Sequence, residues 1–245
     1  FAMPYDTPPG MFRPMLVAVD EAGNVTERSL PHHANARSFR NDVIRLSDGF
    51  LQSKMPEFAA ETAGAANPLE QFLMVNRDVR KANRAALYAI GLDTTPCPMW
   101  QGAFVRMHNA APRADFADER DYVYHGDTVD HQTHLGIDLA SLQQAEVPAA
   151  NAGIVVFADY MGIYGNCVII DHGLGLQTLY AHLSSMAVAK DDTVQKGQPV
   201  GRTGVTGMAG GDHLHYGVLV SGLPVNPREW WDGRWIEHNI AYKLE

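Results

Sequence analysis

Histidines are the residues in this chain best suited to chemistry, and two of them are only one residue apart. His213 and His215 fall in the run 213–220, whose composition predicts a strand. Side chains two positions apart on a strand point to the same face, so both imidazoles would face one space. Such a pair could bind a metal or transfer protons, although either residue alone could be an ordinary hydrogen-bonded histidine.

A second pair, His134 and Asp138, offers an imidazole and a carboxylate four residues apart. In a straight strand the two positions would be roughly 13 Å apart, too far for both to reach one zinc ion at about 2.0 to 2.2 Å. Gly136 lies between them and permits a bend, and residues 130–133 are typical of a loop. We therefore expect a bend that brings both side chains to one point.

His182 adds a further imidazole at the end of another predicted strand. Regular alternation would place Tyr180 and His182 on one face of this strand. The other face would carry Leu179, Ala181 and Leu183. One carboxylate and several imidazoles on adjacent strands suit a zinc site with three protein ligands and an open position for water.

The composition limits the class of protein. The chain has 245 residues, of which 46% are hydrophobic, enough to bury a core in one large or two modest domains. Its net charge of −9, without a long basic run, excludes a general nucleic-acid binder. With only Cys97 and Cys167 as thiols, a metal site must depend on imidazole and carboxylate ligands. No stretch reaches the roughly 18 apolar residues of a membrane span, and a signal or anchor could precede Phe1.

Beyond Trp100 the chain has β character, since short apolar runs alternate with glycine-rich turns. This pattern predicts an antiparallel sheet and a fold that is mainly β, or α+β when the whole chain is counted. The predicted strands are 153–158, 167–170, 176–180 and 214–220.

The first hundred residues differ in pattern. Residues 11–26 predict a strand that runs into an Ala-Gly-Asn turn. Their sequence resembles the last strand of bacterial immunoglobulin-like modules, so residues 1–100 would begin with the remnant of such a module. A β-hairpin belonging to an N-terminal domain is the alternative interpretation.

A helix is predicted from Asn67 to Ile90. Asn67 suits the N-cap, Pro68 the first helical position and Glu70 the third, and Gly91 would stop the helix. One face of this helix is apolar and would be buried.

The polar side of the same helix carries Asn76, Arg80 and Asn83. We interpret these residues as a solvated face, although they could reach a cleft. A linker at 94–98, which contains two prolines, would then divide an N-terminal region, 1–100, from a second domain, 101–245.

Five motifs occur in the order in which they are found in zinc endopeptidases of the LytM and lysostaphin type, and the chain resembles that family over about residues 104–227. Residues 1–100 lie outside the resemblance. The motifs are His-x-x-x-Asp at 134–138, Tyr-Gly-Asn-x-Val-x-Ile-Asp-His-Gly at 164–173, Tyr-x-His-Leu-Ser at 180–184, Gly-x-Thr-Gly-x-Thr-Gly at 201–207 and His-Leu-His-Tyr at 213–216.

The resemblance implies an antiparallel β-sheet groove that holds Zn²⁺ through His134, Asp138 and His215. It also implies that His182 and His213 act beside the metal, one as general base and the other as a donor to the oxyanion or the leaving amine. The resemblance does not say which histidine has which role.

Other positions carry weaker implications. Tyr124, in Tyr-His-Gly, resembles a tyrosine that helps to hold the oxyanion in some relatives, but it stands farther from His134 than usual. His108, His131 and His172 are expected to be structural. Gly217 replaces a glutamate common in the family and should affect packing rather than chemistry.

These implications favour an endopeptidase of the cell envelope, periplasmic or extracellular, that cleaves peptidoglycan peptides, with a D,D cross-link as the preferred bond. One alternative is a non-catalytic scaffold that activates a cell-wall amidase. Another is a latent enzyme whose N-terminal region places Asn76 or Asn83 in the open zinc position. The sequence leaves the oligomeric state open.

Overall fold

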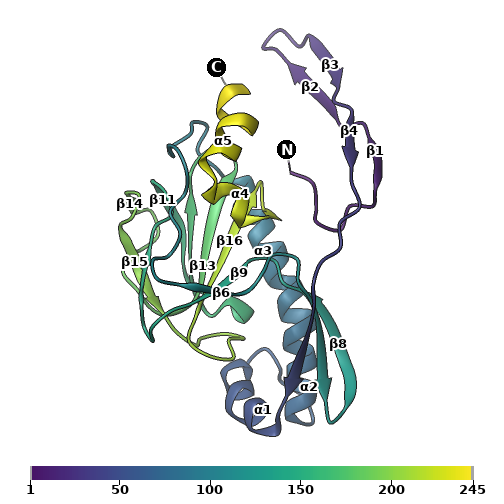
Figure 1. Cartoon of the computed structure of the whole chain (residues 1–245), viewed down its shortest axis with the longest axis vertical. Helices are drawn as coiled ribbons and strands as arrows, with labels where there is room; N and C mark the ends of the chain where they lie inside the picture. The colour runs from purple at the N-terminus through teal and green to yellow at the C-terminus, as the bar shows by residue number, and fades with distance from the viewer. Residues whose placement is uncertain (1, 244–245) are drawn as a thin grey trace.

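The N-terminal residues form a narrow β ribbon that projects from the rest of the molecule (Figure 1). The structure is a computed structural model that describes residues 2–243. The side chains of its outer hairpin are exposed along both strands, and no described strand outside the ribbon pairs with it. The strand predicted within residues 11–26 is one arm of an antiparallel hairpin, whose other arm ends at Ser29. The ribbon consists of β1 (Gly10–Phe12) with β4 (His32–Ala34), and β2 (Met15–Val19) with β3 (Val25–Ser29).

A small three-stranded sheet connects the N-terminal region to the rest of the chain. Strand β5 (Asn41–Leu46) runs parallel to β7 (Glu119–Tyr124), and β7 is antiparallel to β8 (Asp127–Thr133). The sheet thus draws strands from both sides of the expected boundary near residue 100. Two short helical segments follow β5: α1 (Asp48–Lys54) and the 3-10 turn η1 (Met55–Phe58).

The helix predicted after Asn67 is confirmed, and its capping agrees with the sequence: the Asn67 side chain accepts a hydrogen bond from the backbone N–H of Glu70 at 3.0 Å. The expected stop at Gly91 is wrong, because the helix continues to Leu92. Gly91 instead permits close packing, since a Cβ there would lie 2.2 Å from the backbone nitrogen of Gly222. No described helix is long and apolar enough to cross a membrane. The helix consists of α2 (Pro68–Met74), the π-helical turn η2 (Val75–Val79) and α3 (Arg80–Leu92).

The segment predicted as a linker is not helical, but it is held firmly against the sheet. The hydroxyl of Thr94 and the backbone N–H of Thr95 donate to the two carboxylate oxygens of Asp171, each at 2.7 Å. The N-terminal region therefore packs on the second half of the chain over a fixed connection.

A ten-stranded antiparallel sheet forms the body of the molecule, and all four strands predicted beyond Trp100 belong to it. Its central strands follow the order β14-β11-β12-β13-β16-β9-β6. The strands are β6 (Ala111–Ala114), β9 (Ile137–Ala140), β10 (Glu146–Pro148), β11 (Gly153–Tyr160), β12 (Asn166–Asp171), β13 (Leu176–Met186), β14 (Thr193–Val194), β15 (Pro199–Thr203), β16 (Leu214–Val220) and β17 (Leu223–Val225).

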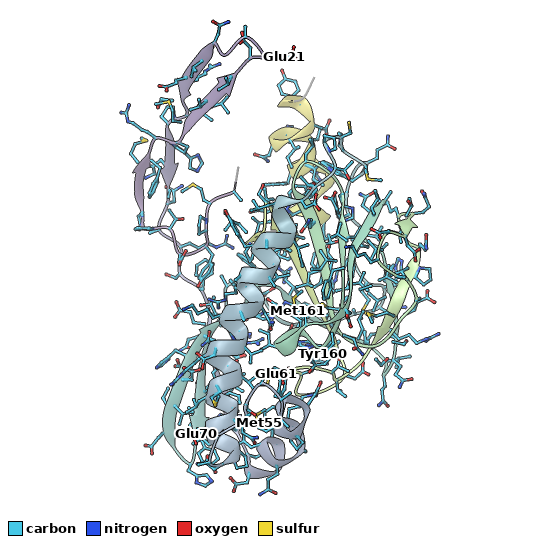
Figure 2. All side chains as sticks on the ribbon, turned by 180° about the vertical axis from the view of Figure 1, so that it is seen from behind. Glu21, Met55, Glu61, Glu70, Tyr160 and Met161 are labelled. Atoms are coloured by element: carbon cyan, nitrogen blue, oxygen red, sulfur yellow. The ribbon has the colours of Figure 1, made fainter. Side chains whose placement is uncertain are left out.

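Two apolar clusters cover this sheet. Phe72 and Leu87 of the long helix bury themselves in one cluster, and Figure 2 shows this helix lying across the sheet. Trp230 and Ile236 belong to the other cluster; they come from the C-terminal helices α4 (Pro227–Trp231) and α5 (Gly233–Asn239). The N-terminal region is thus part of the layer that covers one face of the sheet. The remaining elements are the 3-10 turns η3 (Gly162–Tyr164) and η4 (Ala241–Lys243).

Candidate metal centre

The structure brings together the three predicted metal ligands, His134, Asp138 and His215, which are all buried. Nε2 of His134 lies 2.9 Å from Oδ1 of Asp138 and 2.9 Å from Nδ1 of His215. The third distance, between Nδ1 of His215 and Oδ1 of Asp138, is 3.0 Å. Strand pairing explains part of this convergence, because β9 and β16 place Asp138 directly opposite His215.

The expected bend between His134 and Asp138 is also present. Strand β8 ends at Thr133 and β9 begins at Ile137, so the residues between them lie outside both strands. The loop expected at residues 130–133 is wrong, because these residues belong to β8. The bend turns His134 back toward Asp138, and this allows a pair that a straight strand would hold apart to meet.

The proton positions favour a cation among these ligands. Nδ1 of His134 lies 2.9 Å from the backbone carbonyl oxygen of Asp115, which can only accept, so Nδ1 carries a proton. Nε2 is then the ring atom of His134 that meets Asp138 and His215. The two imidazole nitrogens and the carboxylate oxygen lie within 3.0 Å of one another, so all three can donate lone pairs to one divalent metal. Two imidazoles and a carboxylate are a donor set that suits zinc.

Arg120 is a member of the site that the sequence argument missed. Its Nη2 lies 2.8 Å from Oδ2 of Asp138, the carboxylate oxygen that faces away from the histidines. This ion pair fixes the orientation of Asp138 so that Oδ1 points at the ligand cluster. Alternation along β7 gave the available signal, because Arg120 lies two residues before the buried Tyr122.

His182 reaches the site through an irregularity in β13. Strand β12 pairs Val168 with Tyr180 and Asn166 with Leu183, so two residues of β13 oppose one residue of β12. His182 itself has a positive φ of 63°, which is uncommon for a residue other than glycine.

The expected alternation of faces along β13 is therefore wrong. Leu183 packs in the same apolar cluster as Tyr180, whereas Leu179 and Ala181 belong to the other cluster. The extra residue shifts the alternation, and His182 points into the cavity that contains the metal ligands.

His182 and His213 lie beside each other at the edge of the ligand cluster, with ring centroids 4.8 Å apart. Nδ1 of His182 donates to the backbone carbonyl of Thr206 at 2.8 Å, and Nδ1 of His213 donates to that of Gly211 at 2.8 Å. Nε2 of His182 is therefore left for a substrate or a water. Nε2 of His213 lies 3.5 Å from Oδ1 of Asp138.

The buried charges shift the pKa values in the site. Burial lowers the pKa of His215 to about 4, which keeps its imidazole in the neutral form that binds metals. Burial also lowers the pKa of His182, with the neighbouring His213 adding to the effect. Burial opposes ionisation of Asp138, but His134 and the hydrogen bonds of the other histidines hold its pKa well below the ordinary value. Burial likewise opposes a charge on His213, yet Asp138 raises the pKa of that ring.

The three metal ligands, together with His182 and His213, line one cavity of about 370 Å³. Part of the cavity wall comes from the N-terminal region, which lies outside the five motifs of the sequence resemblance. This part of the wall consists of Ile44, Arg45, Leu46, Phe50, Phe72 and Arg80.

The structure does not bring Tyr124 to this cavity. Its hydroxyl donates to a carboxylate oxygen of Asp48 at 2.6 Å, and its side chain lines a separate surface pocket. Among the other histidines, His172 is fully buried and hydrogen-bonded to the carbonyl of Ala152. His131 pairs with Asp121 at the surface.

The interpretation of Asn76 and Asn83 as part of a solvated face is wrong, because both side chains are buried. Nδ2 of Asn76 donates to Asp130 at 2.8 Å, and Oδ1 of Asn83 accepts from the backbone N–H of Ile163 at 2.9 Å. Neither asparagine lines the cavity of the metal ligands. Sequence periodicity alone could not reveal these partners, which lie more than fifty residues away along the chain.

The segment that carries the site is similar to known proteins. Residues 132–227 match the model of peptidase family M23. The chain is 45% identical over 94 residues to DD-carboxypeptidase/endopeptidase Mpg of Neisseria meningitidis, which covers 38% of this chain and 22% of that protein. It is 41% identical over 93 residues to peptidoglycan DD-endopeptidase ShyA of Vibrio cholerae, again 38% of this chain and 22% of that protein.

Two further matches differ in kind. Murein hydrolase activator EnvC of Escherichia coli is 33% identical over 95 residues, 39% of this chain and 23% of that protein. A solved structure from Pseudomonas aeruginosa that is assigned to peptidase M23 has a TM-score of 0.63 at 19% identity, and covers 94% of this chain and 77% of that chain. The chain thus matches about a fifth of the length of the curated relatives, while the structural likeness extends over nearly all of it. Residues 132–227 of this chain thus match peptidase family M23, the family type that the motifs resemble.

Proposed function

We propose that this chain is a zinc-dependent endopeptidase that hydrolyses D,D cross-links or stem peptides of peptidoglycan in the cell envelope. The observation that carries the proposal is the convergence of His134, Asp138 and His215 in a cavity that also contains two further imidazoles, those of His182 and His213. Two relatives named for DD-endopeptidase activity support the choice of substrate.

When zinc is bound there, it supplies the Lewis acid that activates a water molecule and polarises the scissile carbonyl. His182 acts as general base, since its Nδ1–H is held by the carbonyl of Thr206 and its Nε2 is free to accept a proton. His213 donates from Nε2 to the oxyanion or to the leaving amine when its ring is protonated, the form that the nearby carboxylate of Asp138 favours.

The test compares wild type with three histidine variants by metal analysis and by digestion of purified peptidoglycan. We expect His215→Ala to lose zinc, and His182→Ala to keep zinc while losing roughly a hundredfold or more in turnover. His131→Ala serves as the control, because this exposed ring pairs with Asp121 and does not line the cavity of the metal ligands. A wild type that binds no zinc, or a His182→Ala variant that digests as fast as wild type, would refute the mechanism.

A scaffold that activates a separate amidase is the alternative, and one relative is named as such an activator. The complete ligand set and the two additional histidines favour an enzyme, because a scaffold has no need of an open metal position. Purified protein that stimulates a cell-wall amidase but hydrolyses no peptidoglycan after zinc loading would support the scaffold instead.

Latency is a second candidate property, favoured by a specific contact between the N-terminal region and the rim of the cavity. Lys54 donates to the backbone carbonyl of Val205 and pairs with Glu57 at 2.8 Å. Glu57 in turn accepts from the backbone N–H of Gly207 at 2.6 Å and from the hydroxyl of Tyr160 at 2.9 Å. Figure 2 shows the neighbouring Met55 and Glu61 on the same side of the long helix as Tyr160.

These contacts flank Thr206, whose carbonyl orients His182, so residues 54–57 could hold the rim in a resting position. Under this hypothesis Glu57→Ala raises the rate of hydrolysis, while Glu61→Ala, a change at an exposed residue four positions further on, leaves it unaltered. An unchanged or lower rate for Glu57→Ala, with zinc still bound, would count against latency.

A further inference from the structure

Arg80 is placed in the wall of the metal cavity by a helix that lies outside the M23 match. It faces the same space as His182 and Tyr164, although it comes from the segment that the sequence suggested was solvated. A guanidinium beside a peptidase centre can recognise a carboxylate through two parallel hydrogen bonds.

The π-helical turn Val75–Val79 creates the setting for this side chain. The backbone N–H of Arg80 bonds to the carbonyls of Arg77 and Val75, not to that of Asn76 four residues back, which an α-helix would use. The carbonyl of Asn76 instead accepts from Nε of Arg80 at 3.1 Å. The π-helical turn thus frees the carbonyl of Asn76 to hold Nε of the guanidinium in place.

The side chain of Asn76 fixes the guanidinium a second time. Its Oδ1 accepts from Nη2 of Arg80 at 2.6 Å, while its Nδ2 donates to Oδ2 of Asp130 at 2.8 Å. Asn76 is fully buried, so this amide has one orientation that satisfies both partners. Asp130 is itself paired with Arg77 at 3.0 Å.

Charge balance distinguishes Arg80 from the other arginine close to the metal ligands. Arg120 is neutralised by Asp138 at 2.8 Å. Within residues 2–243 no ion pair to a carboxylate is formed by Arg80, whose hydrogen bonds both go to the uncharged Asn76. Burial lowers the pKa of its guanidinium, and the positive charges of Arg84 and Arg120 add to this effect. A half-buried cation that is rigidly held and has no carboxylate partner would be stabilised by an anionic group of a bound ligand.

We propose that Arg80 is a specificity-determining residue that binds a carboxylate of the substrate peptide, with Asn76 as the residue that positions it. The proposal rests on the proposed function, since it assumes that peptides enter the cavity of the metal ligands. It identifies the preferred substrate class as acidic stem peptides with a free carboxylate close to the cleaved bond, and places their amidated forms as poorer substrates.

The test uses a pair of synthetic probes: a stem-peptide dimer joined by a D-alanyl to diamino-acid amide, with its carboxylates free, and the same dimer with its carboxylates amidated. Binding is measured by calorimetry in the zinc-loaded His182→Ala background, so that hydrolysis does not interfere. We expect the free acid to bind roughly tenfold or more tightly than the amide. Arg80→Met should weaken binding of the acid by the same factor and leave binding of the amide unchanged.

Two further variants complete the cycle. Arg84→Met is the matched control, because this exposed arginine lies one turn along the same helix and does not line the cavity; it should retain the preference for the acid. Arg80→Lys keeps the charge but loses the planar fork, so it should show an intermediate preference and serves if Arg80→Met fails to fold.

The proposal is overturned if the His182→Ala protein with Arg80 unchanged binds the acid and the amide equally, or binds neither. It is also overturned if Arg80→Met weakens binding of both probes to the same extent. Hydrolysis of the free acid by the protein with His182 intact is assayed separately and tests the proposed function. A protein that prefers the acid but does not hydrolyse it would refute the endopeptidase and leave the carboxylate site in place.

Discussion

The backbone of Gly136 lies against the imidazole of His215, so position 136 has no room for a side chain. A Cβ at this position would lie 2.5 Å from Cε1 and 2.5 Å from Nε2 of that ring, and 2.8 Å from the carbonyl oxygen of Tyr216. The bend between His134 and Asp138 therefore has a second purpose besides bringing those two ligands together. It also leaves the space in which the third ligand is seated.

We expect Gly136→Ala to displace His215 and to lower the affinity for zinc by about tenfold or more, because ligand orientation controls metal binding. Chelator competition measures this affinity. Gly217→Ala is the matched control: its Cβ would meet its nearest neighbour, Leu179, at 3.4 Å, an ordinary contact. If Gly136→Ala binds zinc as tightly as Gly217→Ala, the close approach has no effect on the site.

Arg120 should influence the metal through Asp138. Replacing it with methionine removes the 2.8 Å ion pair and frees the carboxylate to rotate. Loss of such an orienting partner typically costs about 10- to 100-fold in metal affinity. We expect this loss for Arg120→Met in titrations at pH 7, and none for Arg113→Met, an exposed arginine on the nearby strand β6. Equal affinities for the two variants would show that Asp138 needs no such support.

Local signals in the sequence predicted much of the site and of the fold. The N-cap at Asn67 depends on residues within one turn, and the meeting of His134 with Asp138 depends on the bend in the few residues between strands β8 and β9. Features of this kind are set by neighbours along the chain, so spacing and residue type reveal them. The antiparallel sheet beyond residue 100 followed in the same way from short apolar runs and turns.

The features that were missed depend on partners that are distant along the chain. Simple alternation cannot anticipate the extra residue that turns His182 toward the cavity, because the bulge arises from pairing with β12. The sequence pattern placed Asn76 on the surface, because it could not reveal that Asp130, fifty-four positions away, is its buried hydrogen-bond partner. Tyr124 had the right neighbours in sequence, yet β7 carries it to Asp48 instead. Tertiary contacts overrode each local pattern.

His172 should make the fold sensitive to acid. Burial lowers its pKa to about 4, against about 6.5 in an unfolded chain. Between these values the unfolded chain binds the proton and the folded chain does not, so stability is lost as the pH falls. We expect this residue to reduce the free energy of unfolding by about 2 kcal/mol between pH 6.5 and pH 5.

Urea unfolding at both pH values measures this loss, and comparison with His172→Gln isolates it because the other groups titrate in both proteins. The variant should depend less steeply on pH than wild type. His108→Gln, a change at an exposed histidine, should not alter the slope. Parallel curves for wild type and His172→Gln would contradict the prediction.

The long helix that carries Arg80 should be anchored by the contact between Gly91 and Gly222. A Cβ at position 91 would lie 2.2 Å from the nitrogen and 2.3 Å from Cα of Gly222, and these two backbone atoms cannot move aside cheaply. We expect Gly91→Ala to destabilise the protein by about 1 to 3 kcal/mol in urea unfolding, despite the better helix propensity of alanine. Gly49→Ala is the control, since Gly49 is also helical but has no atom within 4 Å of the added Cβ; it should leave stability unchanged or raise it. A neutral Gly91→Ala would mean that the helix end can separate from the β16–β17 turn without cost.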